Sequence, residues 1–143
     1  MRSLVIIISI VSAVIFIACN KGGYGPPEDN GPHVINPSDT TAPTIDIYTP
    51  TDAQVFASGN AINITGKVVD SGGLYRGSIR VIDDANGNVL KDQPYEIHSV
   101  VSYNYAISYT PSVSSVSNYT VKVSFEDHGL NVTTKTVKVK INP

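Results

Sequence analysis

Carboxylates stand beside turn-forming residues at several points of this sequence. Asp39 precedes Thr-Thr-Ala-Pro, Asp70 opens Asp-Ser-Gly-Gly, and Glu126 and Asp127 precede His-Gly-Leu. Their oxygens are hard ligands of the kind that Ca²⁺ prefers. The same residue types also stabilise turns by accepting hydrogen bonds from backbone N–H groups, and the chain lacks an Asp-x-Asp-x-Asp spacing. Calcium binding and turn capping therefore both remain open.

Basic residues form a second group with a regular spacing. They occupy alternate positions of segments that have the pattern of strands, so their side chains are expected on one solvent-facing side. Such a face could attract an anionic glycan or a phosphate group. Lysine on strand edges also prevents pairing with other chains, which is the alternative. The residues are Arg76, Arg80, Lys122, Lys138 and Lys140.

Catalysis has little support in the sequence. The three histidines, His33, His98 and His128, do not have a metal-ligand spacing. The serines are not accompanied by a nucleophile-elbow or triad pattern. We therefore expect a protein that is not an enzyme, with no cofactor other than the Ca²⁺ considered above.

Cys19 is the single cysteine, and it ends an apolar run. Arg2 precedes the run, in which Ser9 and Ser12 are the only polar residues from position 4 to 18. That length suits a signal peptide and is shorter than the ~20 apolar residues of a spanning helix. The pattern predicts a bacterial lipoprotein signal over residues 1–18, with Cys19 carrying the lipid. An ordinary secretory signal and an uncleaved short anchor are the alternatives.

Residues 19–41 are expected to be a flexible tether, because glycine and proline are frequent there. Several acyl chains on Cys19 would give stable anchoring. Asp39-Thr40-Thr41 is similar to a short O-glycosylation signal of Gram-negative anaerobes, so Thr40 is a candidate glycan site; coincidence is the alternative. The expected location is the cell envelope, at the outer membrane, and the side that the domain faces is left open.

Charge excludes one class of partner. Without residues 1–18 the chain keeps 9 basic and 12 acidic residues, a net charge of −3. This mild value argues against bulk nucleic-acid binding.

Alternating apolar residues then predict strands from residue 44 onward. A bulge is predicted near Thr134, because Val132 and Val137 have opposite parity. About seven short antiparallel strands over residues 42–143 indicate an all-β, immunoglobulin-like β-sandwich. The strands are expected at 44–48, 62–68, 75–81, 89–91, the second half of 94–109, 119–125 and 131–141.

Three segments resemble bacterial immunoglobulin-like domains of surface and secreted proteins. They are Pro-Thr-Ile at 43–45, Ile-Thr-Gly-Lys-Val-Val-Asp-Ser-Gly-Gly-Leu at 64–74, and Tyr-Thr-Val-Lys-Val-Ser-Phe-Glu-Asp-His-Gly-Leu-Asn at 119–131. The resemblance covers about residues 42–142 and extends to single-domain lipoproteins of Gram-negative envelopes. It implies an adhesion, binding or spacer module. In that topology Asp39, Asp70, Glu126 and Asp127 would meet at the pole next to the tether.

The expected function is a lipid-anchored envelope module that binds a glycan or an envelope protein without catalysis. A passive structural or spacer subunit of a surface assembly is one alternative. An accessory protein of a glycan-uptake system is another.

Lipidation gives the first testable prediction. Metabolic labelling with an acyl analogue should mark the protein, and Cys19→Ser should abolish the label because the thiol that accepts diacylglycerol is lost. Label that persists in Cys19→Ser would contradict the assignment.

Overall fold

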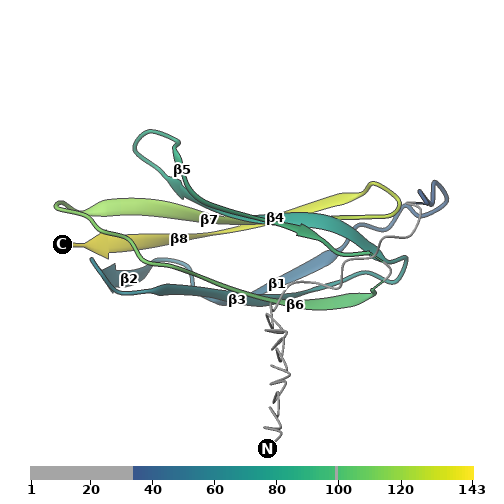
Figure 1. Cartoon of the computed structure of the whole chain (residues 1–143), viewed down its shortest axis with the longest axis horizontal. Coiled ribbons are helices and arrows are strands. Elements are labelled where there is room, and N and C mark those ends of the chain that lie inside the picture. The colour runs from purple at the N-terminus through teal and green to yellow at the C-terminus, as the bar shows by residue number, and fades with distance from the viewer. Residues whose placement is uncertain (1–33, 99) are drawn as a thin grey trace, which may run out of the picture.

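Alternating burial along each strand builds this fold. In the computed structural model, which describes residues 34–98 and 100–143, β3 (Ile62–Val69) buries every second side chain, and β7 (Ser117–Asp127) does the same. Two sheets pack these buried faces against each other (Figure 1). Cys19 and the predicted signal peptide lie outside the described residues.

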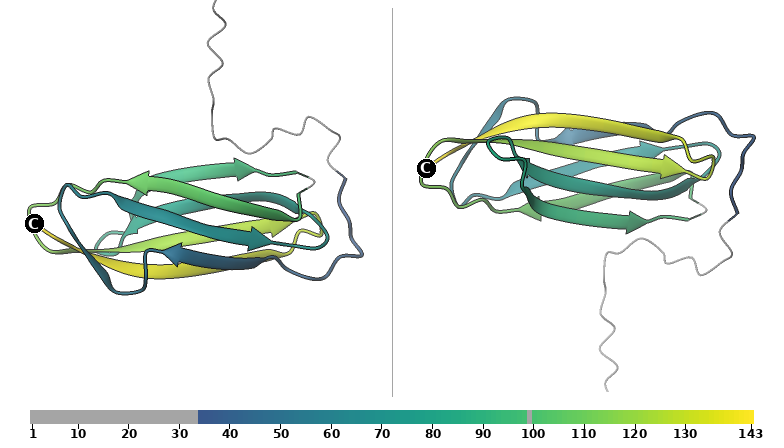
Figure 2. Two further views of the ribbon diagram at one scale, coloured as in Figure 1. Left: turned by 90° about the horizontal axis from the view of Figure 1, so that it is seen from below. Right: turned by 90° about the horizontal axis from the view of Figure 1, so that it is seen from above.

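The two sheets have the strand arrangement of an immunoglobulin-like sandwich (Figure 2). The three-stranded sheet has the order β1 (Thr44–Thr49), β3, β6 (Ser102–Tyr109). The five-stranded sheet has the order β2 (Gln54–Ala57), β8 (Val132–Asn142), β7, β4 (Leu74–Asp83), β5 (Val89–Glu96). The predicted all-β, immunoglobulin-like fold is therefore confirmed.

Three details differ from the sequence-based expectation. The strand expected at 89–91 is longer and extends to Glu96 as β5. β2 was not predicted, because its four residues are nearly all exposed and carry no alternating pattern. It pairs in parallel with β8. The predicted bulge near Thr134 is wrong. β7 and β8 pair in unbroken register from Ser117↔Ile141 to Glu126↔Val132. Val132 therefore faces outward, as strand alternation requires, and is 58% exposed.

An aromatic stack crosses the centre of the core. The rings of Tyr105 on β6 and Phe125 on β7 lie 5.8 Å apart at an interplanar angle of 27°. Each ring covers a glycine in the neighbouring strand of its own sheet: a Cβ at Gly66 would collide with Tyr105, and a Cβ at Gly77 would collide with Phe125. The stack therefore fits only because both positions lack a side chain.

The Tyr105 hydroxyl also ties the edge strand to the sheet. It reaches across Gly66 of β3 and donates a hydrogen bond of 2.7 Å to the carbonyl of Asp46 on β1. Burial raises the pKa of Tyr105, which keeps the hydroxyl protonated as a donor.

One end of the sandwich gathers three connections and the start of the described chain. The β3–β4 turn, the β5–β6 connection and the β7–β8 turn meet there, and β1 begins beside the end of β3. Residues 34–41 run along the same end, opposite the C-terminus (Figure 1). We call this end the N-terminal pole. The described part of the chain consists of strands, turns and loops, without a helix of the length and hydropathy that a membrane crossing requires.

The glycine at position 66 gives the second prediction. Gly66→Ala should lower the free energy of unfolding by about 1–3 kcal/mol or more, because the added methyl collides with the Tyr105 ring and the Asp46 carbonyl. Asn63→Ala, at an exposed position of the same strand, should stay within about 0.5 kcal/mol. Denaturant unfolding measures both, and equal effects would contradict the proposed fit.

Candidate functional site

Three aspartates converge at the N-terminal pole. One carboxylate oxygen each from Asp39, Asp70 and Asp127 lies within 4.8 Å of the other two. Asp70 is 4% exposed and Asp127 is fully buried. Alternation places Asp127 on the inward side at the end of β7, and Asp70 directly follows β3. Three residues of the predicted four-residue group therefore lie together at this pole.

Backbone and side-chain donors hold two of these carboxylates in place. Asp127 accepts hydrogen bonds from the backbone N–H of Asn131 at 2.8 Å and from its side-chain Nδ2 at 2.9 Å. Asp70 Oδ1 accepts from the N–H of Gly72 at 2.8 Å. These bonds are turn-capping interactions, so the turn chemistry expected from the sequence is present at this end.

Burial raises the pKa of the Asp70 carboxyl. The hydrogen bond from Gly72 acts against this effect, while the nearby charges of Asp127 and Asp39 add to it. Among the described residues, none of the three aspartates forms an ion pair with lysine or arginine. Carboxylates thus gather at this end without a lysine or arginine partner in the described part of the chain.

Glu126, the fourth acidic residue of the predicted group, lies apart from this cluster. Alternate residues of β7 face opposite sides of the sheet, so Glu126 points outward while Asp127 points inward. The Glu126 carboxylate accepts hydrogen bonds from Nε of Arg76 at 2.7 Å and from Nη2 of the same arginine at 3.3 Å. Thr40, the candidate glycan site, is exposed beside Asp39.

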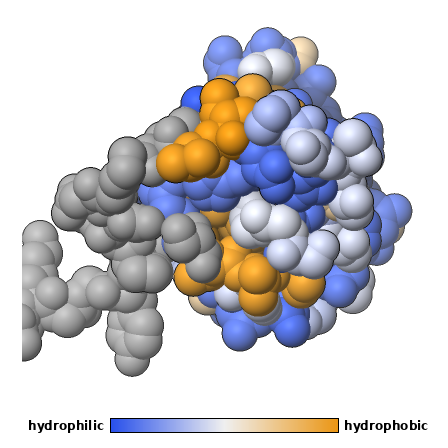
Figure 3. All heavy atoms as spheres, turned by 90° about the vertical axis from the view of Figure 1, so that its right-hand side faces the viewer, coloured by the Kyte–Doolittle hydropathy of each residue, from blue (hydrophilic) through white to orange (hydrophobic). Residues whose placement is uncertain are grey.

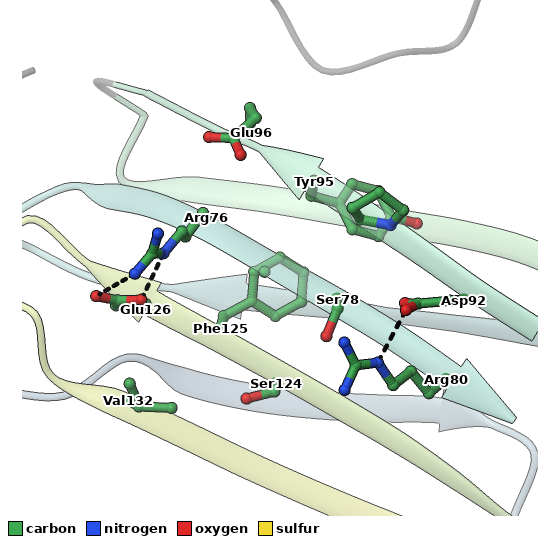
Figure 4. Close-up of a pocket in the computed structure, with 12 residues that line it drawn as sticks. Arg76, Ser78, Arg80, Asp92, Tyr95, Glu96, Ser124, Phe125, Glu126 and Val132 are labelled. Carbon is green, nitrogen blue, oxygen red and sulfur yellow. Dashed lines mark hydrogen bonds and ion pairs between the residues drawn. The ribbon is translucent and has the colours of Figure 1, made fainter. Parts of the chain in front are cut away.

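The outer face of the five-stranded sheet carries a hollow of about 310 Å³ (Figure 4). Short side chains pair in one row across three strands and lie on its floor, namely Pro94, Ser78 and Ser124. Longer charged side chains form a row on each side: Glu96, Arg76 and Glu126 on one side, and Asp92, Arg80 and Lys122 on the other. We call this hollow the outer groove.

Ion pairs neutralise much of the charge around the outer groove. Arg76 binds Glu126, and Arg80 Nε contacts Asp92 at 3.1 Å. The first row has one more acid than base. The second row has one more base than acid when Lys122, which continues it beyond the residues that line the hollow, is included, so the charges of the six residues sum to zero. The groove therefore presents many paired donors and acceptors with little net field.

The five predicted basic residues share this sheet but do not form one uniform positive patch. Lys138 contacts Asp84 at 3.3 Å, so three of the five have an acidic partner. Arg80 and Lys122 lie directly opposite each other on β4 and β7. Lys140 pairs with Asn118 at the far end of β8.

Sequence reasoning missed the residues that form the groove floor. Ser78 and Ser124 lie 46 positions apart, and their contact depends on the register of β4 with β7. The sequence pattern that could have indicated them is a serine between two charged residues at alternate, outward-facing positions of each strand. Val132 lies exposed at the edge of the groove.

Comparisons with known proteins give structural similarities alone. No family model matches the sequence, and no curated protein matches it. Among solved structures, the chain is similar to fibronectin(III)-like modules of Clostridium thermocellum CbhA, with 20% identity and a TM-score of 0.45. That match covers 71% of this chain and 47% of the other, so this chain spans about half the length of that one.

Two further structures match over similar lengths. The sulfur carrier protein SoxY from Chlorobium limicola has 13% identity and a TM-score of 0.38, over 73% of this chain and 82% of the other. A CARDB domain from Pyrococcus furiosus, solved with di-metal ions, has 15% identity and a TM-score of 0.39, over 71% and 93%. The chain itself has an immunoglobulin-like fold, which is compatible with a non-catalytic binding or structural module.

Proposed function

We propose that this protein is a lipid-anchored module of the cell envelope that binds a hydroxyl-rich glycan in the outer groove without chemical conversion. The observation that supports this proposal is the groove itself, a row of short side chains between two walls of paired arginine and carboxylate groups. The pattern at Cys19 supports the anchor, and the outer membrane is the proposed location.

The chemistry of the walls favours a neutral sugar. Arginine that is already bound to a carboxylate keeps further N–H groups for hydrogen bonding, and the carboxylate keeps further lone pairs. A sugar hydroxyl both donates and accepts, so it can bind to such pairs without bringing charge. Pro94 and Val132 add small apolar surfaces that suit the C–H faces of a sugar ring.

An anionic glycan is a second candidate, favoured by one observation. Arg80 and Lys122 lie opposite each other with Asp92 as the single acid of their row, which leaves one positive charge. A passive spacer in a surface assembly and an accessory protein of glycan uptake are the remaining alternatives, and neither requires an occupied groove.

A groove-filling variant tests the proposal. The full chain, purified in detergent, is applied to an array of neutral and anionic glycans. Ser78→Tyr should reduce capture at least about tenfold, because the ring fills the floor and blocks close contact. The matched control, Asn63→Tyr on the exposed face of the other sheet, should bind normally. Equal binding by both variants would contradict the groove as the site.

Charge reversal distinguishes the two ligand classes. Arg80→Glu together with Lys122→Glu should leave capture of a neutral glycan independent of salt. If the ligand is anionic, the double variant instead weakens capture and removes its salt dependence, since ~0.15 M salt screens exposed charges beyond roughly 8 Å. Unchanged binding in every groove variant would transfer the site to the three-stranded sheet, whose surface carries Tyr48, Asn63, Thr65 and Asn104.

A further inference from the structure

The N-terminal pole holds buried carboxylates that form no ion pair with a lysine or arginine among residues 34–98 and 100–143. Two of its three aspartates are at most 4% exposed, and an oxygen of each lies within 4.8 Å of an oxygen of the others. Charged groups are rarely buried unless they are paired or bind a metal. A cation at the centre of the three carboxylates would supply the charge that such burial favours.

Asp39 adds an independent observation. Its Oδ1 accepts a hydrogen bond from the N–H of Thr41 at 2.9 Å. Its Oδ2 is shielded from solvent and has no hydrogen-bond partner in the described structure. A carboxylate oxygen buried in this way loses its hydration without compensation, and a bound cation would compensate it directly.

The direction of this oxygen is fixed by the residues around it. A Cβ at Gly72 would collide with Asp39 Oδ2 and would lie 3.3 Å from Asp70 Oδ1, so the unpartnered oxygen faces the Asp70 carboxylate. A Cβ at Gly129 would collide with the Asp39 carbonyl. Both turns therefore leave room for Asp39 because each has a glycine at the contact point.

We propose that Asp39, Asp70 and Asp127 bind one Ca²⁺ ion, which fastens residues 34–41 to the N-terminal pole. Calcium binds oxygen at about 2.3–2.6 Å, so two ligands on opposite sides of one ion are separated by at most about 5 Å. The three carboxylate oxygens meet this limit. The Mg²⁺ ion requires shorter bonds and a near-ideal octahedron, which makes it the weaker candidate.

The ion would connect three segments that are distant in sequence. Asp39 belongs to the segment that leads toward Cys19, Asp70 follows β3, and Asp127 ends β7. Existing hydrogen bonds already hold the first segment loosely: the N–H of Asn36 donates to the His128 carbonyl at 2.8 Å, and Asn131 Nδ2 donates to the Asp39 carbonyl at 3.0 Å. The ion adds the bond that sets how firmly the domain is attached to its tether.

The surface of this pole agrees with a site for a small ion. Figure 3 shows hydrophilic residues across its middle, with hydrophobic patches on either side. The exposed apolar residues of the segments that meet there are Val34, Ile35, Val101 and Leu130.

Calorimetry and thermal unfolding test the proposal on the full chain in detergent, with CaCl₂ as the probe. Titration should give one site per chain, with half-saturation between about 10⁻⁴ and 10⁻³ M, the range of extracellular modules. Saturating CaCl₂ should raise the midpoint of unfolding by roughly 5 °C or more, and MgCl₂ should raise it less. Absence of heat and of any midpoint shift would overturn the proposal.

Neutral variants separate metal binding from structural hydrogen bonding. Asp70→Asn should lose most of the calcium-dependent shift and, in EDTA, should unfold at a higher temperature than the unchanged protein, because repulsion within the cluster is relieved. A purely turn-capping role instead predicts a midpoint in EDTA no higher than that of the unchanged protein, because the amide oxygen of asparagine can still accept from the Gly72 N–H. Glu126→Gln is the matched control: it removes the same charge beside Asp127, and it should keep the full calcium response.

Hydrogen exchange tests the fastening of the segment. Calcium should slow exchange of the Asn36 and Thr41 amides at least about tenfold, since opening of residues 34–41 then requires release of the ion. Asp39→Asn should abolish this protection. Protection that is the same in EDTA and in CaCl₂ would overturn the fastening role, whatever the outcome of the glycan experiments.

Discussion

The contact between two aromatic rings and two glycines fixes the geometry of the sandwich. Tyr105 and Phe125 stack between the sheets, and each ring lies over a position without a side chain, at Gly66 and Gly77. Protein interiors are packed as densely as organic crystals, so rings of this size leave little freedom in the spacing or register of the sheets. The Tyr105 hydroxyl extends the same constraint to the edge strand through the carbonyl of Asp46.

This fixed register determines what the molecule presents at its surfaces. Successive residues of β7 face opposite sides of the sheet, so Glu126 reaches the outer groove while its neighbour Asp127 is buried at the N-terminal pole. A shift of one residue would exchange the two carboxylates and destroy both arrangements. The candidate glycan groove and the candidate calcium site thus depend on the same pairing of β7 with its neighbours.

The two sites also differ in how charge is balanced. Around the outer groove, each arginine contacts a carboxylate, and the partly exposed pairs remain hydrated. At the pole, the buried Asp70 and Asp127 meet the partly buried Asp39 without a lysine or arginine partner among the described residues, and one oxygen of Asp39 has no hydrogen-bond partner there. Paired charges at a surface suit a ligand of many weak hydrogen bonds, whereas buried like charges suit a compact cation.

The sequence by itself determined the strand faces, the turns and the fold class, because period-two burial and turn chemistry are local properties. It also predicted that Asp39, Asp70 and Asp127 share a pole, once an immunoglobulin-like topology was assumed. Only the tertiary structure decided that Glu126 pairs with Arg76, that β2 joins β8, and that Ser78 lies beside Ser124. These features depend on pairing between residues far apart in the chain, and local sequence patterns do not specify which strands pair or in what register.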